Sequence, residues 1–538
     1  MWKYILLAIS FGFIVGVSIE KTDIQSAGKL IGIEFTSSEM DSMLPGLIQD
    51  RETYISNRKD FPTNDISPVI EFNPHPIGFE IPKNQKPLYF SQVIGIELPQ
   101  NNDDLAFYSV LELSELIRQR KITSLELTQF FLERLKKHNP TLECVITLTE
   151  ERAIEKAKKA DQEINAGIYR GLLHGIPYGA KDLFAVKGYR TTWGAMPYKD
   201  QVIDLDATVI QKLDDAGAVL VAKLTMGALA WGDIWFGGIT KNPWNIEKGS
   251  SGSSAGSASA VAAGLVPFAL GTETLGSIVS PSTVCGTTGL RPTYGQVSRY
   301  GAMALSWSMD KIGPITRSAE DAAIVFSVLK GKDFKDPTTV DAAFNFDSRE
   351  EIKNLKVGYI KSDFDKSYPF KENDSIVLDI LKAAGIELIP LELPSLPDLR
   401  MILSAEAAAA FDELTITGKD DLLVRQVRNA WPNVFRQARF IPAVEYIQAN
   451  RRRRILIEEM NKIFKSVDVY LNPSWSSNSL TITNYTGHPC ITFPNGLVNE
   501  TPSSITITGR LYGEADVISL AKFIQGKSDW NKKSPPGF

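Results

Sequence analysis

The chain has 538 residues, of which 43% are hydrophobic and 22% charged, and its formal net charge is -5. This composition is typical of a globular protein with a sizeable core, and it excludes a disordered, collagen-like or multi-span membrane protein. The weakly acidic balance lacks the broad basic surface of a nucleic-acid binder, so we expect no nucleic-acid partner.

The N-terminus resembles an export signal. Met1-Trp2-Lys3 is followed by a mostly apolar run from Tyr4 to Ile19. As a helix this run is about 24 Å long, shorter than the ~30 Å core of a bilayer. We therefore predict that residues 1–19 are a cleavable signal peptide, with a retained membrane anchor or a buried first helix as alternatives. The expected location is periplasmic or extracellular, with membrane contact only through such an anchor.

Residues 20–104 are predicted to be an N-terminal arm, because they are rich in proline, asparagine and charge. One helical stretch is expected near residues 38–57, and the rest should lie extended on the main body. The arm either wraps this body or caps the active site. Organised structure is expected from near Tyr108, with the main domain at residues 105–538.

Two capping boxes open the main domain. Ser109 with Glu112, and Thr123 with Glu126, place a carboxylate three residues after a hydroxyl, which predicts two helix starts. Further helices are expected at residues 151–164 and 207–216, and strands at 176–180 and 218–222. Alternating strands and helices predict an α/β sheet with helices on both faces.

The later half is harder to assign. Helices are expected around residues 401–414 and 441–465, and strands at 467–471 and 504–507 that return to the sheet. The run from Arg451 to Arg454 lies in the second of these helices, and we predict that it forms a solvated helix face.

Two segments of small residues carry the chemistry. Residues 249–257 read Gly-Ser-Ser-Gly-Ser-Ser-Ala-Gly-Ser, and residues 271–277 read Gly-Thr-Glu-Thr-Leu-Gly-Ser. Such residues let a backbone pack tightly and turn its N–H groups toward a ligand. A flexible linker is disfavoured because residues 258–265 continue as a predicted tight helix. A phosphate cradle is disfavoured because neither of the usual glycine motifs is present.

The first segment also fits G-x-S-x-G, the nucleophile elbow of the α/β-hydrolases. Ser254 would then be the nucleophile and His488, which lies downstream, its base. An elbow needs a strand immediately before the serine, and residues 242–248 do not read as a strand. We therefore keep this arrangement as a minor alternative.

With Lys181, the two serine segments resemble the amidase signature family. The resemblance spans roughly residues 105–526, and its further matching segments are His174–Asp182, Thr191-Thr192, Asn242–Trp244, Gly289–Thr293, Val297–Gly301, Asp310–Pro314, Gly487–Pro489 and Gly509-Arg510. It implies a Ser–cis-Ser–Lys triad in which Ser277 is the nucleophile, Ser253 the bridging serine and Lys181 the base. The family's spacing of 24 residues between the serines is kept, since 277 − 253 = 24.

These residue types suit the implied reaction. A serine hydroxyl is a weak nucleophile until a neighbouring base takes its proton. A lysine can act as this base only when neutral, and burial lowers its pKa. The hydroxyl of Ser253 both donates and accepts, so it can relay the proton. The resemblance also assigns the oxyanion hole to the backbone N–H groups of Thr274, Leu275, Gly276 and Ser277.

Two positions depart from the commonest family pattern. Leu275 stands where glycine is usual, and Val279 where arginine is usual. Leu275 would be strained if its position required a positive φ. Glu273, with an apolar residue at 279, is more similar to the peptide-amidase-like branch of the family than to the amidotransferase subunit.

The resemblance implies one large α/β/α domain around a mixed, largely parallel sheet. It implies hydrolysis of a linear carboxamide through an acyl-enzyme, with a small-molecule, lipid or peptide amide as substrate. One alternative is an amidotransferase A-type subunit, which the export-like N-terminus and the absence of a basic surface disfavour. Another is a non-catalytic binding protein on the same scaffold, which the complete triad disfavours. The sequence predicts no oligomeric state.

Four aromatic residues near the serine segments are candidates for an acyl or aryl pocket: Trp231, Trp235, Phe236 and Trp307. Ordinary core packing is the alternative for each of them.

No metal or other cofactor is predicted. The three cysteines, Cys144, Cys285 and Cys490, form neither a disulfide framework nor a C-x-x-C pair, and the four histidines are scattered. Each cysteine is expected to be a small buried core residue.

Overall fold

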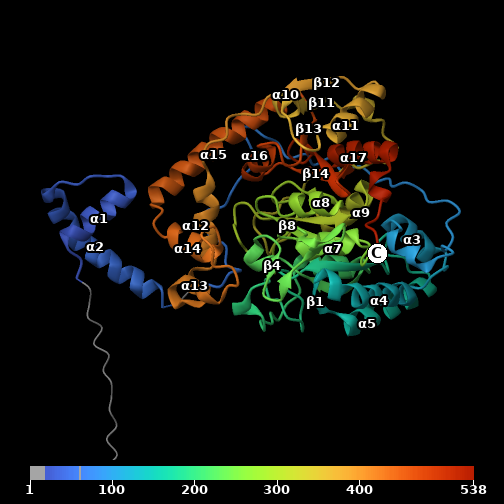
Figure 1. Ribbon diagram of the computed structural model, residues 1–538, viewed down its shortest axis with the longest axis horizontal. Coiled ribbons are helices and arrows are strands. Elements are labelled where there is room, and N and C mark those ends of the chain that lie inside the picture. The colour runs from blue at the N-terminus through green and yellow to red at the C-terminus, as the bar shows by residue number, and fades with distance from the viewer. Residues whose placement is uncertain (1–17, 60–61) are drawn as a thin grey trace, which may run out of the picture. The chain divides into compact units, whose positions relative to one another are not determined.

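The computed structural model describes residues 18–59 and 62–538 (Figure 1). Its chain divides into two compact units. One unit extends to Thr63 and includes Phe440–Pro442, and the other comprises Asn64–Arg439 and Ala443–Phe538. The predicted export signal lies outside the described residues, apart from its last two. Among the helices that the structure describes, none combines the length and apolar character needed to span a bilayer.

The smaller unit contains two helices, α1 (Lys21–Ile31) and α2 (Ser37–Asn57). The second confirms the helix predicted at residues 38–57. It begins with a capping box, in which the Glu39 carboxylate accepts the Thr36 N–H at 2.7 Å and the Thr36 hydroxyl accepts the Glu39 N–H at 3.3 Å. None of the residues of α2 is buried, so this helix adds little to any hydrophobic core.

An extended segment follows at the start of the larger unit. Between residues 64 and 101, all of them described, the chain forms no helix and no strand longer than a single bridge. Its side chains hold it to the rest of the unit. The Asn64 amide donates to the Ala304 carbonyl at 2.9 Å and accepts the Ala304 N–H at 2.7 Å. His75 Nε2 lies 2.6 Å from the Tyr512 hydroxyl.

The larger unit is built around an eleven-stranded sheet. The strands are, in spatial order, β1 (Val145–Leu148), β3 (Val219–Leu224), β2 (Pro177–Lys181), β8 (Ala269–Glu273), β10 (Lys311–Thr316), β9 (Thr288–Arg291), β14 (Cys490–Val498), β15 (Thr501–Gly509), β13 (Val469–Pro473), β11 (Val357–Ile360) and β12 (Leu388–Leu391). Each of the strands expected at 176–180, 218–222, 467–471 and 504–507 overlaps one of these. Two short ribbons lie outside the sheet: β4 (Ile234–Trp235) with β5 (Gly238–Ile239), and β6 (Lys241–Asn242) with β7 (Asn245–Gly249).

The sheet is mixed, as predicted, but it is not largely parallel. Four neighbouring pairs are parallel, namely β2–β3, β2–β8, β11–β12 and β11–β13. The other six are antiparallel. The middle of the sheet returns through antiparallel neighbours such as β14 and β15, which a tight turn joins without a crossover helix. The α/β alternation of the first half of the chain therefore does not extend to the later strands.

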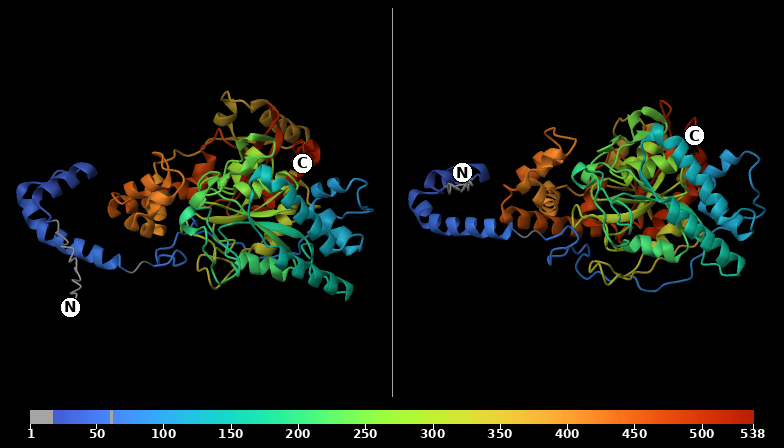
Figure 2. Two further views of the ribbon diagram at one scale, coloured as in Figure 1. Left: turned by 60° about the horizontal axis from the view of Figure 1, so that its bottom comes forward. Right: turned by 90° about the horizontal axis from the view of Figure 1, so that it is seen from below.

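Helices cover both faces of the sheet (Figures 1 and 2). They are α3 (Val110–Arg118), α4 (Ser124–Leu142), α5 (Glu150–Asn165), α6 (Thr208–Asp215), α7 (Ala255–Ala262), α8 (Val279–Cys285), α9 (Ala319–Leu329), α10 (Lys361–Asp365), α11 (Lys371–Ala383), α12 (Arg400–Ala410), α13 (Asp412–Thr417), α14 (Trp431–Ala438), α15 (Ala443–Ile463), α16 (Ser479–Thr486) and α17 (Glu514–Ser528). Both predicted capping boxes form, with Ser109 starting α3 and Thr123 starting α4. The helices α12 to α15, orange in Figure 1, gather at one end of the sheet.

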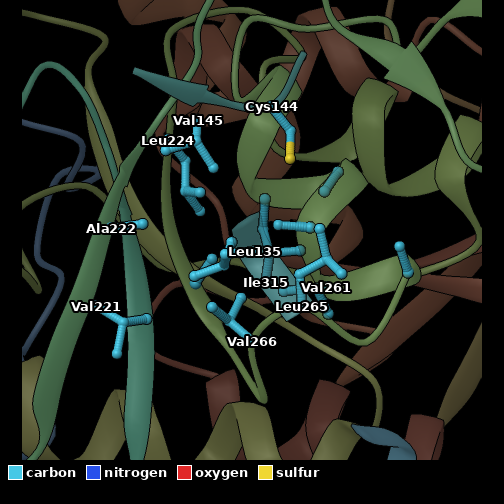
Figure 3. Packing of buried hydrophobic residues seen from close by; sticks show 14 of the residues in the cluster. Leu135, Cys144, Val145, Val221, Ala222, Leu224, Val261, Leu265, Val266 and Ile315 are labelled. Carbon is cyan, nitrogen blue, oxygen red and sulfur yellow. The ribbon is translucent and has the colours of Figure 1, made fainter. Parts of the chain in front are cut away.

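The main core packs α4, α7 and the first strands against one another (Figure 3). Leu135 of α4, Val221 of β3, Val261 of α7 and Ile315 of β10 meet in one buried cluster, which also contains Cys144. Close packing of this kind resists displacement of its members. It therefore fixes α7, and with it the serine segment that starts this helix.

One side chain of the arginine run departs from the prediction. Arg453 is only 1% exposed, whereas its neighbours in the run are exposed. Its Nε donates to the Tyr485 carbonyl at 2.6 Å, and its Nη1 to the Ser308 hydroxyl at 2.8 Å. The guanidinium also lies 3.5 Å from the centre of the Phe72 ring. The predicted solvated face is wrong at this position, because consecutive helix residues point in different directions and one of the four meets the core.

Candidate active site

Lys181 is the last residue of β2 and has no solvent exposure. Its Nζ donates to three hydroxyls: Ser253 Oγ at 2.7 Å, Thr272 Oγ1 at 2.8 Å and Ser254 Oγ at 3.2 Å. Burial lowers the pKa of Lys181 to about 7, although the charges of Asp310 and Glu273 act in the opposite direction. A substantial share of the side chain is therefore neutral near neutral pH.

The first serine segment lies directly against this lysine. The peptide bond between Gly252 and Ser253 is cis. A Cβ on Gly252 would lie 1.8 Å from the Gly232 carbonyl oxygen, so only glycine fits there. Next to Ser253, the Ser254 hydroxyl accepts the Thr272 N–H and donates to the Thr272 carbonyl, both at 3.1 Å. Ser254 thus ties this segment to the end of β8.

Ser277 follows β8 in a turn before α8. Its carbonyl accepts the Ser254 N–H at 3.2 Å, so the two serine segments are hydrogen-bonded to each other. The Ser277 side chain lines a cavity of about 430 Å³. The structure thus brings the lysine and the segments of both predicted catalytic serines to one place.

The turn from residue 274 to 277 can stabilise an oxyanion. Within the described part of the chain, none of its four backbone N–H groups has a hydrogen-bond acceptor. The positive φ in this turn falls on Gly276, at +101°, and not on Leu275. Leu275 therefore adopts its conformation without the strain considered above. Free donors beside the nucleophile are what an oxyanion hole requires.

A buried carboxylate holds this turn in place. Glu273 Oε2 accepts the N–H groups of Ile278 and Val279 at 2.8 and 2.9 Å. Its Oε1 accepts from Arg291 and from the Asn484 amide, both at 2.7 Å. Burial alone would raise the pKa of Glu273, but Arg291 and the hydrogen bonds hold this pKa below its usual value. Arg291 therefore balances the buried charge of Glu273.

The predicted aromatic residues do not share one site. Trp231 lines the cavity at Ser277. Trp235 and Phe236 are outside its lining and pack edge to face with centroids 4.9 Å apart. Trp307 lines an adjoining cavity of about 70 Å³, which includes Thr272 and shares Thr274 and Leu305 with the first.

Sequence reasoning missed the opposite wall of the Ser277 cavity. This wall comes from α12, α14 and α16, and its side chains include Leu403, Trp431, Val434 and Tyr485. These helices lie more than 120 residues beyond Ser277, in the segment that was hardest to assign. An amphipathic stretch at 431–438 was the available signal, but it does not show which surface the stretch covers.

The alternative serine–histidine arrangement finds no support in the geometry. His488 Nδ1 lies 2.8 Å from the Thr486 hydroxyl, and its ring stacks on Phe464. Burial, together with Arg291, lowers the pKa of His488 to about 3. Ser254 is bonded to Thr272 and to the lysine instead. One prediction used against this arrangement was wrong, because residues 245–249 do form a strand, β7. Among the described strands it pairs with β6 alone, since the Asn-Pro-Trp-Asn stretch turns the chain back on itself.

A protein-family model described as Amidase matches residues 126–499, well over half of the chain. The chain belongs to the amidase family. The A-type subunit of the glutamyl-tRNA(Gln) amidotransferase of Coxiella burnetii (strain Dugway 5J108-111) is 34% identical over 478 residues, which are 79% of this chain and 99% of that relative.

Solved structures agree with this assignment. The native peptide amidase from Stenotrophomonas maltophilia matches with a TM-score of 0.70 and 26% identity, covering 81% of this chain and 99% of that one. A bacterial aryl acylamidase of the amidase signature family shares the fold, with a TM-score of 0.72 and 23% identity over 80% of this chain and 99% of that one.

The family assignment confirms the predicted resemblance and the predicted class of reaction, hydrolysis of an amide C–N bond. The three cysteines are buried and free, as expected. In the part of the chain described here, no three His, Cys, Asp or Glu side chains are grouped so that they could hold a metal ion.

Proposed function

We propose that this amidase hydrolyses a linear carboxamide with Ser277 as nucleophile, Ser253 as proton relay and Lys181 as base. The observation that carries the proposal is the fully buried Lys181 Nζ, 2.7 Å from Ser253 Oγ, beside a serine that lines a cavity. A lysine with a purely structural role does not need to be buried against three hydroxyls. A lysine that acts as a base needs a lowered pKa, which burial produces.

The chemistry balances in two steps. Ser277 Oγ bonds to the amide carbon while its proton passes to Ser253, whose own proton passes to neutral Lys181. The N–H groups of residues 274–277 stabilise the oxyanion. The proton then returns through Ser253 to the amide nitrogen, the C–N bond breaks, and the amine leaves. Water attacks the resulting ester by the same route, which releases the acid and restores Ser277.

A second candidate function is favoured by the relatives. The curated relative reported above is named as the A-type subunit of a glutamyl-tRNA(Gln) amidotransferase. In that function the same triad would act on an amide donor while the chain worked with partners. Glu273 and the apolar Val279 support the hydrolase instead, because this pattern resembles the peptide-amidase-like branch. A purified single chain that releases free acid and amine without a partner would decide for the hydrolase.

Fluorophosphonate labelling with peptide mapping tests the triad. We expect a single adduct on Ser277 in the wild type, no adduct in Ser277→Ala, and strongly slowed labelling in Ser253→Ala and Lys181→Ala. Ser375→Ala, in α11, is the control and should label normally. An adduct on Ser254 would favour the serine–histidine arrangement. A folded wild type without any adduct would support a non-catalytic scaffold.

The compartment is part of the same proposal. We propose that residues 1–19 direct export, because a lysine followed by a short apolar run is typical of a signal peptide. N-terminal sequencing of the protein recovered from its native cells tests this. A mature N-terminus near residue 19 supports export with cleavage, and an intact Met1 in the cytosolic fraction contradicts it.

A further inference from the structure

The cavity at Ser277 has two walls of different origin. The catalytic side is formed by residues 230–232, 251–252 and 274–277, which belong to or adjoin the two serine segments. The opposite side is formed by Leu403 of α12, Trp431 and Val434 of α14, and Tyr485 of α16. Its volume of about 430 Å³ lies within the range of small-molecule sites. The second wall lines the same cavity as Ser277, so a substrate bound there would contact it.

Two tryptophans from opposite walls meet inside this cavity. The rings of Trp231 and Trp431 are nearly perpendicular, with their centroids 4.5 Å apart. Trp431 is fixed in position, because its Nε1 donates to the Leu229 carbonyl at 2.9 Å and its ring stacks on Phe435. With the neighbouring aliphatic side chains of α12 and α14 they form a rigid apolar surface. Such a surface gains most from a flat or bulky apolar group.

Charge is nearly absent from the lining. Among the described residues that line the cavity, Arg400 alone carries a charged side chain. Its Nε and Nη2 donate to the two carboxylate oxygens of Asp398 at 3.1 and 2.7 Å. The Arg400 side chain is 85% exposed, so it stands at the rim. The described lining thus lacks the carboxylate and the free cation that would bind the ammonium and carboxylate groups of an amino acid.

We infer that this cavity selects a carboxamide that carries a bulky, uncharged apolar group, and that Trp231 and Trp431 determine this selectivity. The inference rests on the proposed function, since it names the substrate class of the same site. A zwitterion such as glutamine would lose its hydration at these walls without gaining ion pairs, which costs free energy. A phenyl group would instead replace water against the apolar side chains that line both walls.

Hydrolysis rates on four amides test the inference: 3-phenylpropionamide, acetanilide, propionamide and L-glutamine. We expect kcat/KM for at least one of the two aromatic amides to exceed that for propionamide by about tenfold to a hundredfold. The value for glutamine should be lower than that for propionamide. The two aromatic amides show whether the ring is held on the acyl or the amine side. Equal or faster hydrolysis of glutamine or propionamide would overturn the inference while leaving the proposed function intact. If no amide is hydrolysed and Ser277 is not labelled, the proposed function itself fails.

Variants of the second wall locate the selectivity. We expect Trp431→Ala to lower the ratio of kcat/KM between the preferred aromatic amide and propionamide by about tenfold, mainly through KM, and Trp431→Phe to keep most of it. Val434→Glu puts a charge on the same wall and keeps the Trp431 side chain, and it should lower the ratio as well. Trp530→Ala, near the C-terminus and outside both cavities, is the matched control and should leave the ratio unchanged. If Trp431→Ala does not fold, Val434→Glu decides, and an unchanged ratio in the folded variants overturns the inference.

Discussion

Lys181 is the residue whose protonation controls the proposed reaction. Only its neutral form can take the proton from Ser253, and its pKa is lowered to about 7 by burial. We therefore expect kcat/KM to fall about tenfold per pH unit below pH 7 and to level off above it. A pH–rate profile on the preferred amide measures this. A profile that is flat from pH 5 to 8, or one that rises on acidification, would contradict the assignment of Lys181 as base.

Thr272 tunes this lysine through one hydrogen bond. Its hydroxyl accepts from Lys181 Nζ at 2.8 Å, and each acceptor stabilises the charged form. We expect Thr272→Val to lower the pKa further and to move the acidic limb of the pH–rate profile down by roughly half to one unit. Thr417→Val is the control, because this hydroxyl donates to the Glu413 carbonyl of its own helix, α13. A shift to higher pH, or an equal shift in the control, would contradict this explanation.

At the scale of single elements, the start of α7 depends on a glycine that helix propensity alone would disfavour. A Cβ on Gly256 would lie 2.5 Å from the Cys144 carbonyl oxygen and from the Thr225 N–H nitrogen. Alanine normally stabilises a helix interior by about 1 kcal/mol relative to glycine. Here the added Cβ would overlap with backbone atoms, so the substitution should destabilise instead of stabilise. We expect Gly256→Ala to lower the free energy of unfolding by about 1–3 kcal/mol.

Gly526 in α17 provides the matched control for this prediction, because a Cβ added to it would meet nothing within 4 Å. Gly526→Ala should raise stability by about 0.5–1 kcal/mol. Thermal or denaturant unfolding of both variants shows whether each substitution raises or lowers the stability. Equal stabilisation of both would show that the α7 start has room to move.

The turn that carries the proposed oxyanion donors depends on Glu273. Replacing it by glutamine leaves Arg291 buried without a counter-charge and weakens the acceptor for two N–H groups of the turn. We expect Glu273→Gln to lower kcat by about tenfold to a hundredfold with a smaller change in KM, because the donors move and the pocket does not. The expected loss of stability is about 3 kcal/mol.

Steady-state kinetics and unfolding measurements on Glu273→Gln separate the two effects. The control is Glu372→Gln, a carboxylate in the first turn of α11, which is distant from the turn and should change neither quantity. A large rise in KM with unchanged kcat would place the role of Glu273 in substrate binding instead.

The sequence predicted the elements that depend on local signals. The capping boxes at Ser109 and Thr123 give α3 and α4 because a cap is satisfied within three residues. The two serines and the lysine could be proposed from the sequence because they lie in motifs. The hydrogen bond between Asn484 and Glu273 could not be predicted, because 211 residues separate the two and only the tertiary fold brings them together. The burial of Arg453 and the cavity wall at Trp431 were missed for the same reason.

At the scale of the whole molecule, the mixed sheet explains how distant segments form one site. Lys181 ends β2, and Glu273 ends the neighbouring strand β8. The carboxyl ends of parallel neighbours meet at one edge of a sheet, where α/β proteins place their ligands. The α/β class could be predicted from alternating strands and helices, but the antiparallel middle could not, because strand direction depends on non-local pairing.

The border between the compact units yields the last prediction, which compares two truncated chains. α2 buries none of its residues, whereas the segment from residue 64 onward is anchored by Asn64, His75 and the Phe72 ring. A chain that starts at Asn64 should keep its melting temperature within about 2 °C, because it loses little buried surface. A chain that starts at residue 105 exposes the aromatic and hydrogen-bonding groups beneath the segment, and it should melt at least about 5 °C lower.

Amide hydrolysis should persist in the first chain, since every residue of the triad and the cavity is retained. Equal melting temperatures would show that the extended segment adds no stability, and loss of activity in the first chain would give the helices α1 and α2 a role at the active site.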